Sequence, residues 1–394
     1  MTSTIYAVAA ARTAIGSFGG SLSGQTPGAL GAHVTRAAVE RAGVAPDEVG
    51  HVFFGQVINT HPRDLFVSRI AALGAGLPQS VPALTVNRLC GSGLQAIISA
   101  AQAIMLGDCE IAIGGGTEVM SRAPFYLPDM RWGRKLGDST VIDGLNGALT
   151  DPFNDILMGV TAENVAERFG ITRQQQDALA LESQQRAARA IAEGRFTAQI
   201  APISIVSRKA ARIFDCDEYV RRNAAPADFD SLPPVFKPGD GTVTAGNASG
   251  INDGAGAVLL ASEAAVHRLG LTPMARLVSY GFAGVDPAYM GIGPVPATRQ
   301  ALERGSLTVA DLDVFEANEA FAAQACAVAS ELGFDPARVN PNGSGIALGH
   351  PVGATGAIIT AKLLYELRRT GGRYGLTTMC IGGGQGIAAV WERV

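Results

Sequence analysis

The feature that most constrains the fold is an internal repeat. Residues 38–53 carry a charged amphipathic stretch, an Asp and then an apolar Val-Phe pair, and residues 301–315 carry the same signals in the same order. Residues 97–116 and 358–384 form a second pair, in which an apolar stretch leads to a glycine-rich one. Each unit predicts a helix followed by a strand. One such match is common by chance among α/β units. Two in the same order favour a duplicated α/β chain.

The length of 394 residues allows several domains with ample buried area, and 49 glycines with 47% hydrophobic residues favour close packing of helices on sheets. We assign residues 1–120 to an N-terminal half, completed by about 251–270, and residues 271–394 to a C-terminal half. Residues 121–250 are richer in charge, proline and irregular sequence. They are predicted to be an inserted loop domain.

Charge and cysteine usage exclude several classes of protein. A net charge of -4 gives no global attraction to nucleic acid or to anionic membranes. The five cysteines include no Cys-x-x-Cys pair, so neither a disulfide framework nor a zinc site is expected. No apolar run reaches transmembrane length without glycine or polar interruption, and the N-terminus carries no basic, apolar leader. These features favour a cytoplasmic protein without a metal.

Cys90 lies where a short apolar strand, residues 82–86, gives way to a helix in the sequence NRLCGSGLQ. Residues 89–107 contain no charged side chain, which predicts a buried helix. Unpaired amides at a helix start lower the pKa of a thiol and stabilise a developing oxyanion. We therefore interpret Cys90 as a nucleophile, although a lone cysteine is more often a small core residue.

The same turn also fits a dinucleotide-binding fingerprint. Gly91, Gly93 and Ala96 match G-x-G-x-x-A after a strand, and Glu118 lies where a ribose-binding carboxylate is expected. That interpretation predicts an oxidoreductase. It leaves the glycine-rich turns around His350 and Cys380 without a role.

His350 lies at the start of a predicted helix, at nearly the same position that Cys90 has relative to the equivalent helix of the first half. A pseudo-twofold axis between the halves would therefore bring the two helix starts together. Cys380 ends an apolar stretch before three glycines and predicts a hairpin whose amides complete an oxyanion site. Asn318 and Glu319 follow another strand, where an N-cap role is the alternative for Glu319. The remaining histidines are interpreted as structural: His33, His51, His61 and His267.

Several long motifs give the chain a resemblance to the thiolase family, the acetyl-CoA acetyltransferases and 3-ketoacyl-CoA thiolases. They are ARTAIG at residues 11–16, the Cys90 turn, TAENVA at 161–166, NASG at 247–250, NEAF at 318–321, and the turns of His350 and Cys380. The chain is most similar to bacterial 3-ketothiolases of broad short-chain specificity. The resemblance implies two βαβαβαββ halves stacked as five layers, αβαβα, with the inserted loop domain between them.

The resemblance also implies an activity: reversible Claisen condensation of acetyl-CoA with a short acyl-CoA, or thiolysis of a 3-ketoacyl-CoA, with ping-pong kinetics. Cys90 would carry the acyl group, His350 would activate it, and Cys380 would exchange the α-proton. One oxyanion hole would use His350 and a water held by Asn318, and the other the amides of Cys90 and Gly382. No cofactor is permanently bound. Coenzyme A, as substrate, would lie near residues of the insert: Leu157, Met158, Arg221 and Ser249.

Two features depart from the biosynthetic members of the family. Leu157 replaces a usual histidine, and Phe125 replaces a common His or Tyr, which predicts tolerance of acyl groups longer than acetyl. The family also implies a homo-oligomer, with a tetramer favoured over a dimer. Arg131, Arg134 and Lys135 fall where relatives carry a tetramer-forming loop, although a solvated basic loop would have the same composition. A decarboxylating ketoacyl synthase and a non-catalytic lipid-binding relative would share this fold.

Overall fold

The computed structural model describes residues 4–206 and 211–394. Its two halves repeat one order of elements, as the sequence predicts. The N-terminal half contains β1 (Ile5–Arg12), β2 (Gly16–Ser17), α1 (Pro27–Ala42), β3 (His51–Gly55), α2 (Val67–Gly74), β4 (Ala83–Val86), α3 (Ser92–Leu106), β5 (Ile111–Val119), β12 (Asn252–Ser262) and α8 (Glu263–Leu269). The C-terminal half contains β13 (Ala275–Gly284), α9 (Pro294–Gly305), β14 (Val314–Ala317), α10 (Ala322–Leu332), α11 (Gly345–Leu348), α12 (Thr355–Thr370), β15 (Tyr374–Ile381) and β16 (Gln385–Arg393).

Both halves place their strands in the same order, β4-β3-β5-β12-β1 in one and β14-β15-β16-β13 in the other. Strand β1 joins β13 through only two residue pairs, which connects the two arrays into one mixed sheet. The fully described C-terminal half has no strand equivalent to β4. A single bridge from Phe315 to Val339 stands in its place, so the predicted repeat is incomplete there.

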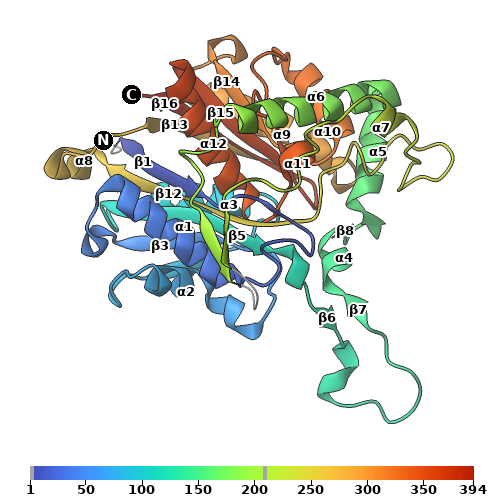
Figure 1. Ribbon diagram of the computed structural model, residues 1–394, viewed down its shortest axis with the longest axis horizontal. Coiled ribbons are helices and arrows are strands. Elements are labelled where there is room, and N and C mark those ends of the chain that lie inside the picture. Colours follow the sequence, from blue (N-terminus) through green and yellow to red (C-terminus); the bar gives the residue numbers. More distant parts are fainter. Residues whose placement is uncertain (1–3, 207–210) are drawn as a thin grey trace.

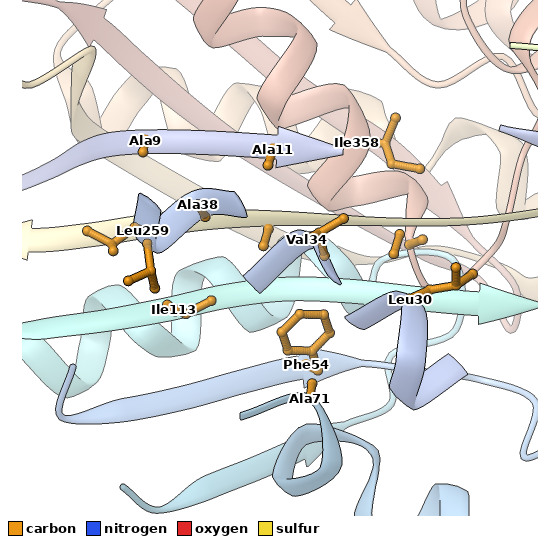
Figure 2. Close-up of a cluster of buried hydrophobic side chains, with 14 of the residues drawn as sticks. Ala9, Ala11, Leu30, Val34, Ala38, Phe54, Ala71, Ile113, Leu259 and Ile358 are labelled. Atoms are coloured by element: carbon orange, nitrogen blue, oxygen red, sulfur yellow. The ribbon is translucent and has the colours of Figure 1, made fainter. Parts of the chain in front are cut away.

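Helices and sheets alternate in five layers, as the fold class predicts (Figure 1). Helices α1 and α2 cover the outer face of the N-terminal strands, and Figure 2 shows side chains of α1, including Leu30 and Val34, in one buried cluster with Phe54 and Ile113. Helices α3 and α12 share one buried cluster with strands of both halves. Helices α9 and α10 cover the opposite outer face.

The two central helices touch at their first turns because glycines lie between them. A Cβ added to Gly93 would lie 2.7 Å from the Ala357 nitrogen, and one added to Gly356 would lie 2.3 Å from the Leu94 nitrogen. Among the described residues, Leu89–Leu106 is long and apolar enough to cross a membrane, but 61% of it is buried, as in a core helix. The close contact brings the Cys90 and His350 turns together, as the repeat predicts.

The chain between β5 and β12 forms a separate set of elements beside the two halves (Figure 1). It contains β6 (Phe125–Tyr126), β7 (Ile142–Asp143), α4 (Gly144–Ala148), β8 (Thr150–Asp151), β9 (Ile156–Leu157), α5 (Met158–Phe169), α6 (Arg173–Ala192), β10 (Ile203–Val206), β11 (Ala211–Phe214) and α7 (Ala227–Asp230). A fully buried ion pair between Arg12 and Asp217, 2.7 Å apart, anchors this segment to β1. In the C-terminal half, three residues make the equivalent connection from β15 to β16.

Candidate active site

The turn that carries Cys90 is fixed by its own hydrogen bonds. Leu89 adopts a left-handed conformation with φ 46°, which is unfavourable for a branched side chain. The Ser92 hydroxyl donates to the Leu89 carbonyl at 2.6 Å and accepts from the Arg88 N–H at 2.8 Å. Cys90 is therefore presented on a strained, braced turn directly before α3, and its side chain is half-buried.

His350 is held in one orientation by the first residue of α12. Its Nδ1 lies 2.6 Å from the Thr355 hydroxyl, which itself donates to the Pro351 carbonyl at 2.9 Å. Because a hydroxyl has one proton, Thr355 must accept from Nδ1–H. The Nε2 lone pair then faces Asn318, whose Nδ2 lies 3.4 Å away. Burial lowers the pKa of His350 to about 4, so the imidazole is neutral and available as a base.

Cys380 lies at the end of β15, opposite Gly386 of β16, in the predicted hairpin. It is 1% exposed and packs with Met290 and Ala320. Burial raises the pKa of its thiol, and negative charge on Cys90 raises it further. Charge on Cys90 therefore disfavours ionisation of Cys380, which is less acidic than a free thiol.

The Cys90 thiol accepts from the amides of Gly382 and of Cys90 itself, and both lower its pKa. Burial outweighs them, and the charge of Glu118 adds to the rise. The net pKa is raised, so the lowering expected from the helix start is wrong. A resting thiol of this kind is neutral and needs a base before it can act as a nucleophile.

A cavity of about 260 Å³ opens beside His350. Leu157, Met158 and Ser249, three of the four residues expected near coenzyme A, line it. Arg221 is exposed outside this lining, and its N–H donates to Gln184. The cavity is mainly apolar; the rest of its lining is Met120, Asn146, Leu149, Gly159, Phe236, Ala248, Gly250, Ile251, Phe321 and Val352.

Asn318 and Glu319 face different partners. Asn318 is 1% exposed, and its Oδ1 has no partner among the described residues. Glu319 accepts from the Ser183 hydroxyl at 2.6 Å and from Asn340 at 2.8 Å, while α10 begins only at Ala322. The N-cap alternative for Glu319 is therefore wrong. Its carboxyl group joins α6 to the loop that holds Asn318.

The geometry contradicts the dinucleotide-binding interpretation. A Cβ on Gly91 would lie 2.6 Å from Ile381, so this glycine, like Gly93, serves packing within the protein rather than approach to a pyrophosphate. Glu118 is fully buried and bonded to backbone amides, out of reach of a ribose. In the described parts of the chain, no group of three His, Cys, Asp or Glu side chains is suited to a metal ion.

Sequence reasoning missed Thr355, which fixes the tautomer of His350. Its only signal was a hydroxyl five residues after the histidine, at the start of a predicted helix. It also gave Glu118 the wrong role. The hydrogen bonds of both residues depend on contacts that only the folded chain creates.

Comparison with known proteins covers the whole chain. Family models described as "Thiolase, N-terminal domain" and "Thiolase, C-terminal domain" match residues 5–264 and 271–393. Beta-ketothiolase BktB of Cupriavidus necator is 61% identical over 394 residues, covering 100% of both chains. An acetyl-CoA acetyltransferase of Thiocystis violacea is 49% identical over 400 residues, again covering 100% of both.

The crystal structure of human mitochondrial 3-ketoacyl-CoA thiolase superposes with a TM-score of 0.98 at 44% identity and 100% coverage of both chains. The same human enzyme in complex with CoA gives 0.97 at 44% identity, covering 100% of this chain and 98% of that one.

Proposed function

Because the chain belongs to the thiolase family, we propose that its acyl transfer is divided among Cys90, His350 and Cys380. The protein is a coenzyme A acyltransferase that condenses acetyl-CoA with an acyl-CoA or cleaves a 3-ketoacyl-CoA. The division of labour follows from the unlike surroundings of the three groups.

In the first half-reaction, His350 acts as the base for Cys90. The observation that carries this step is the Thr355 contact, since Nδ1–H donated to Thr355 leaves the lone pair on Nε2, the atom that accepts the proton. The Cys90 thiolate attacks the thioester carbonyl, and the amides of Cys90 and Gly382 stabilise the oxyanion. Collapse of this intermediate expels the coenzyme A thiolate, which takes the proton from His350 and leaves an acyl-Cys90.

In the second half-reaction, Cys380 gives its thiol proton to Nε2 of His350 and, as a thiolate, takes the α-proton of acetyl-CoA. The enolate oxygen is stabilised by the Nε2–H of His350 and by a water held on Asn318, whose buried Oδ1 lacks a partner among the described residues. The enolate carbon attacks acyl-Cys90, which forms the new carbon–carbon bond, and the Cys90 thiolate leaves and takes the proton from His350. Thiolysis runs through the same steps in reverse.

The acyl-CoA would occupy the cavity beside His350, with Leu157, Met158 and Ser249 along its pantetheine and acyl portions. Arg221, exposed on the insert, would contact the distal end of coenzyme A. The lining favours acyl groups longer than acetyl, because Leu157 supplies no polar group. This supports a broad short-chain specificity.

We further propose a cytoplasmic homotetramer. The β6–β7 arm extends away from the body of the molecule in Figure 1, and Trp132 and Leu136 at its end are 92% and 91% exposed. Apolar side chains so fully exposed are typical of an interaction site. Sizing chromatography of a Trp132→Ser, Leu136→Ser double variant should give a smaller species than the wild type; an unchanged species would contradict the proposed role of the arm.

The function is tested by intact-mass measurement after incubation with acetyl-CoA. A gain of one acetyl group, mapped to Cys90 by peptide analysis, is expected, together with ping-pong kinetics in thiolysis of acetoacetyl-CoA. Acetylation elsewhere, or kinetics that require both substrates to bind before any product leaves, would contradict the proposal.

A further inference from the structure

A buried carboxyl group with no role in the reaction above lies beside the turn that carries His350. Glu118, near the end of β5, is 0% exposed. Its Oε2 accepts from the N–H groups of Val57 at 3.0 Å and Gly353 at 2.9 Å, and its Oε1 accepts from Ile58 at 3.1 Å. Three backbone amides donate to this one carboxyl group, so its position in the fold is fixed.

The bond to Gly353 ties the C-terminal half to the N-terminal half. Gly353 is the third residue after His350, and a Cβ at this position would lie 2.5 Å from Glu118 Oε2. Only glycine therefore lets the turn approach this closely. Val352, next to Gly353, packs in one cluster with Ile58, and Cys90 lies against that cluster.

We propose that Glu118 is a positioning residue for acyl transfer, whose carboxyl group holds the histidine turn against the loop after β3, where Cys90 packs on Ile58 and Val352. This inference rests on the proposed roles of Cys90 and His350. Without the hydrogen bond to Gly353, the backbone that positions His350 relative to Cys90 is no longer held to β5. Misplacement of a catalytic group by about 1 Å costs on the order of 10²-fold in rate.

The charge of Glu118 has a second, opposite effect. Burial raises the pKa of Glu118 to about 8, and the charge of Asp64 adds to the rise, while its three amide donors oppose it. Glu118 is thus ionised in the alkaline range where Cys90 titrates, and its charge raises the pKa of the Cys90 thiol. Asp64 is the titratable group that raises the pKa of Glu118, and Cys90 is the group whose pKa Glu118 raises in turn. Removal of this charge should make Cys90 easier to ionise.

The Glu118→Gln variant separates positioning from general destabilisation. Acetyl labelling of Cys90 by acetyl-CoA should slow by about 10²-fold. Alkylation of Cys90 by iodoacetamide, followed against pH, should shift its midpoint to lower pH. Because exposure of Cys90 by partial unfolding would also lower its pKa, the variant must melt at the wild-type temperature for the two changes to be assigned to Glu118. Glu118→Asp keeps the charge on a shorter arm, so it should slow labelling while the alkylation midpoint stays at the wild-type value.

Glu163→Gln is the matched control, because Glu163 is also buried and accepts from backbone amides, those of Thr242 and Val243. It should leave the alkylation midpoint unchanged. Wild-type labelling rates in Glu118→Gln, or an unmoved midpoint, would overturn the inference; if that variant does not fold, wild-type labelling in Glu118→Asp would do so. Absence of acetyl-Cys90 in the wild type would instead refute the proposed function.

Discussion

The turn that carries Cys90 and the strand that carries Cys380 place the same functional group in two different surroundings. Cys90 sits half-buried on a strained turn, where two amides point at its sulfur. Cys380 is almost fully buried at a strand end, where burial and the neighbouring thiol oppose its ionisation. A nucleophile needs access and donors for an oxyanion, whereas a proton-transfer group needs a confined position beside the substrate. Position in the fold, not residue type, separates the two roles.

Replacing the accessible sulfur should have the largest effect. Cys90→Ser should abolish acetyl labelling and lower thiolysis by at least ~10³-fold, because a hydroxyl at neutral pH is a far weaker nucleophile than a thiol. Labelling is measured by intact mass and thiolysis by loss of 3-ketoacyl-CoA absorbance. Cys326→Ser, at another half-buried cysteine, is the control and should keep both. Persistent labelling of Cys90→Ser would show that another residue carries the acyl group.

The action of His350 as a base can be impaired without a substitution at either cysteine. Thr355→Val keeps the side-chain shape but leaves Nδ1–H of His350 without its acceptor, which costs about 1–3 kcal/mol, or roughly 5- to 150-fold in acetylation rate. Rapid-mixing measurement of acetyl-Cys90 formation tests this. Thr360→Val is the control: it removes a buried hydroxyl of the same helix, one that donates to the Gly356 carbonyl and not to His350. It should leave the acetylation rate unchanged. Equal rates in both variants would refute the tautomer argument.

The smallest expected effect concerns the substrate cavity. Leu157→His should narrow the range of acyl groups, lowering thiolysis of longer 3-ketoacyl-CoA substrates relative to acetoacetyl-CoA by about tenfold, because a polar ring replaces apolar lining. Thiolysis rates across chain lengths, for wild type and variant, test this. A wild-type enzyme that accepts only acetoacetyl-CoA would contradict the expected tolerance.

Much of this arrangement could be predicted from the sequence. The repeat indicated where the helices of Cys90 and His350 begin, because hydrophobic periodicity and glycine turns are local signals. The pKa of Cys90 could not be predicted, since it depends on burial and on Glu118, which is distant in sequence. The partners of Glu118, Thr355 and Glu319 were also hidden. The hydrogen bonds of Glu118 and Glu319 run to groups distant in sequence, and that of Thr355 depends on how the turn after His350 folds back on the first turn of α12.

The central claim, that the two cysteines perform different steps, is tested most directly by Cys380→Ser. The variant should form acetyl-Cys90 from acetyl-CoA at close to the wild-type rate, while condensation falls by about 10²- to 10⁴-fold because the α-proton is no longer removed. Both are measured on one preparation, by intact mass and by product formation. Loss of acetyl labelling together with condensation, in a variant that melts at the wild-type temperature, would contradict the account.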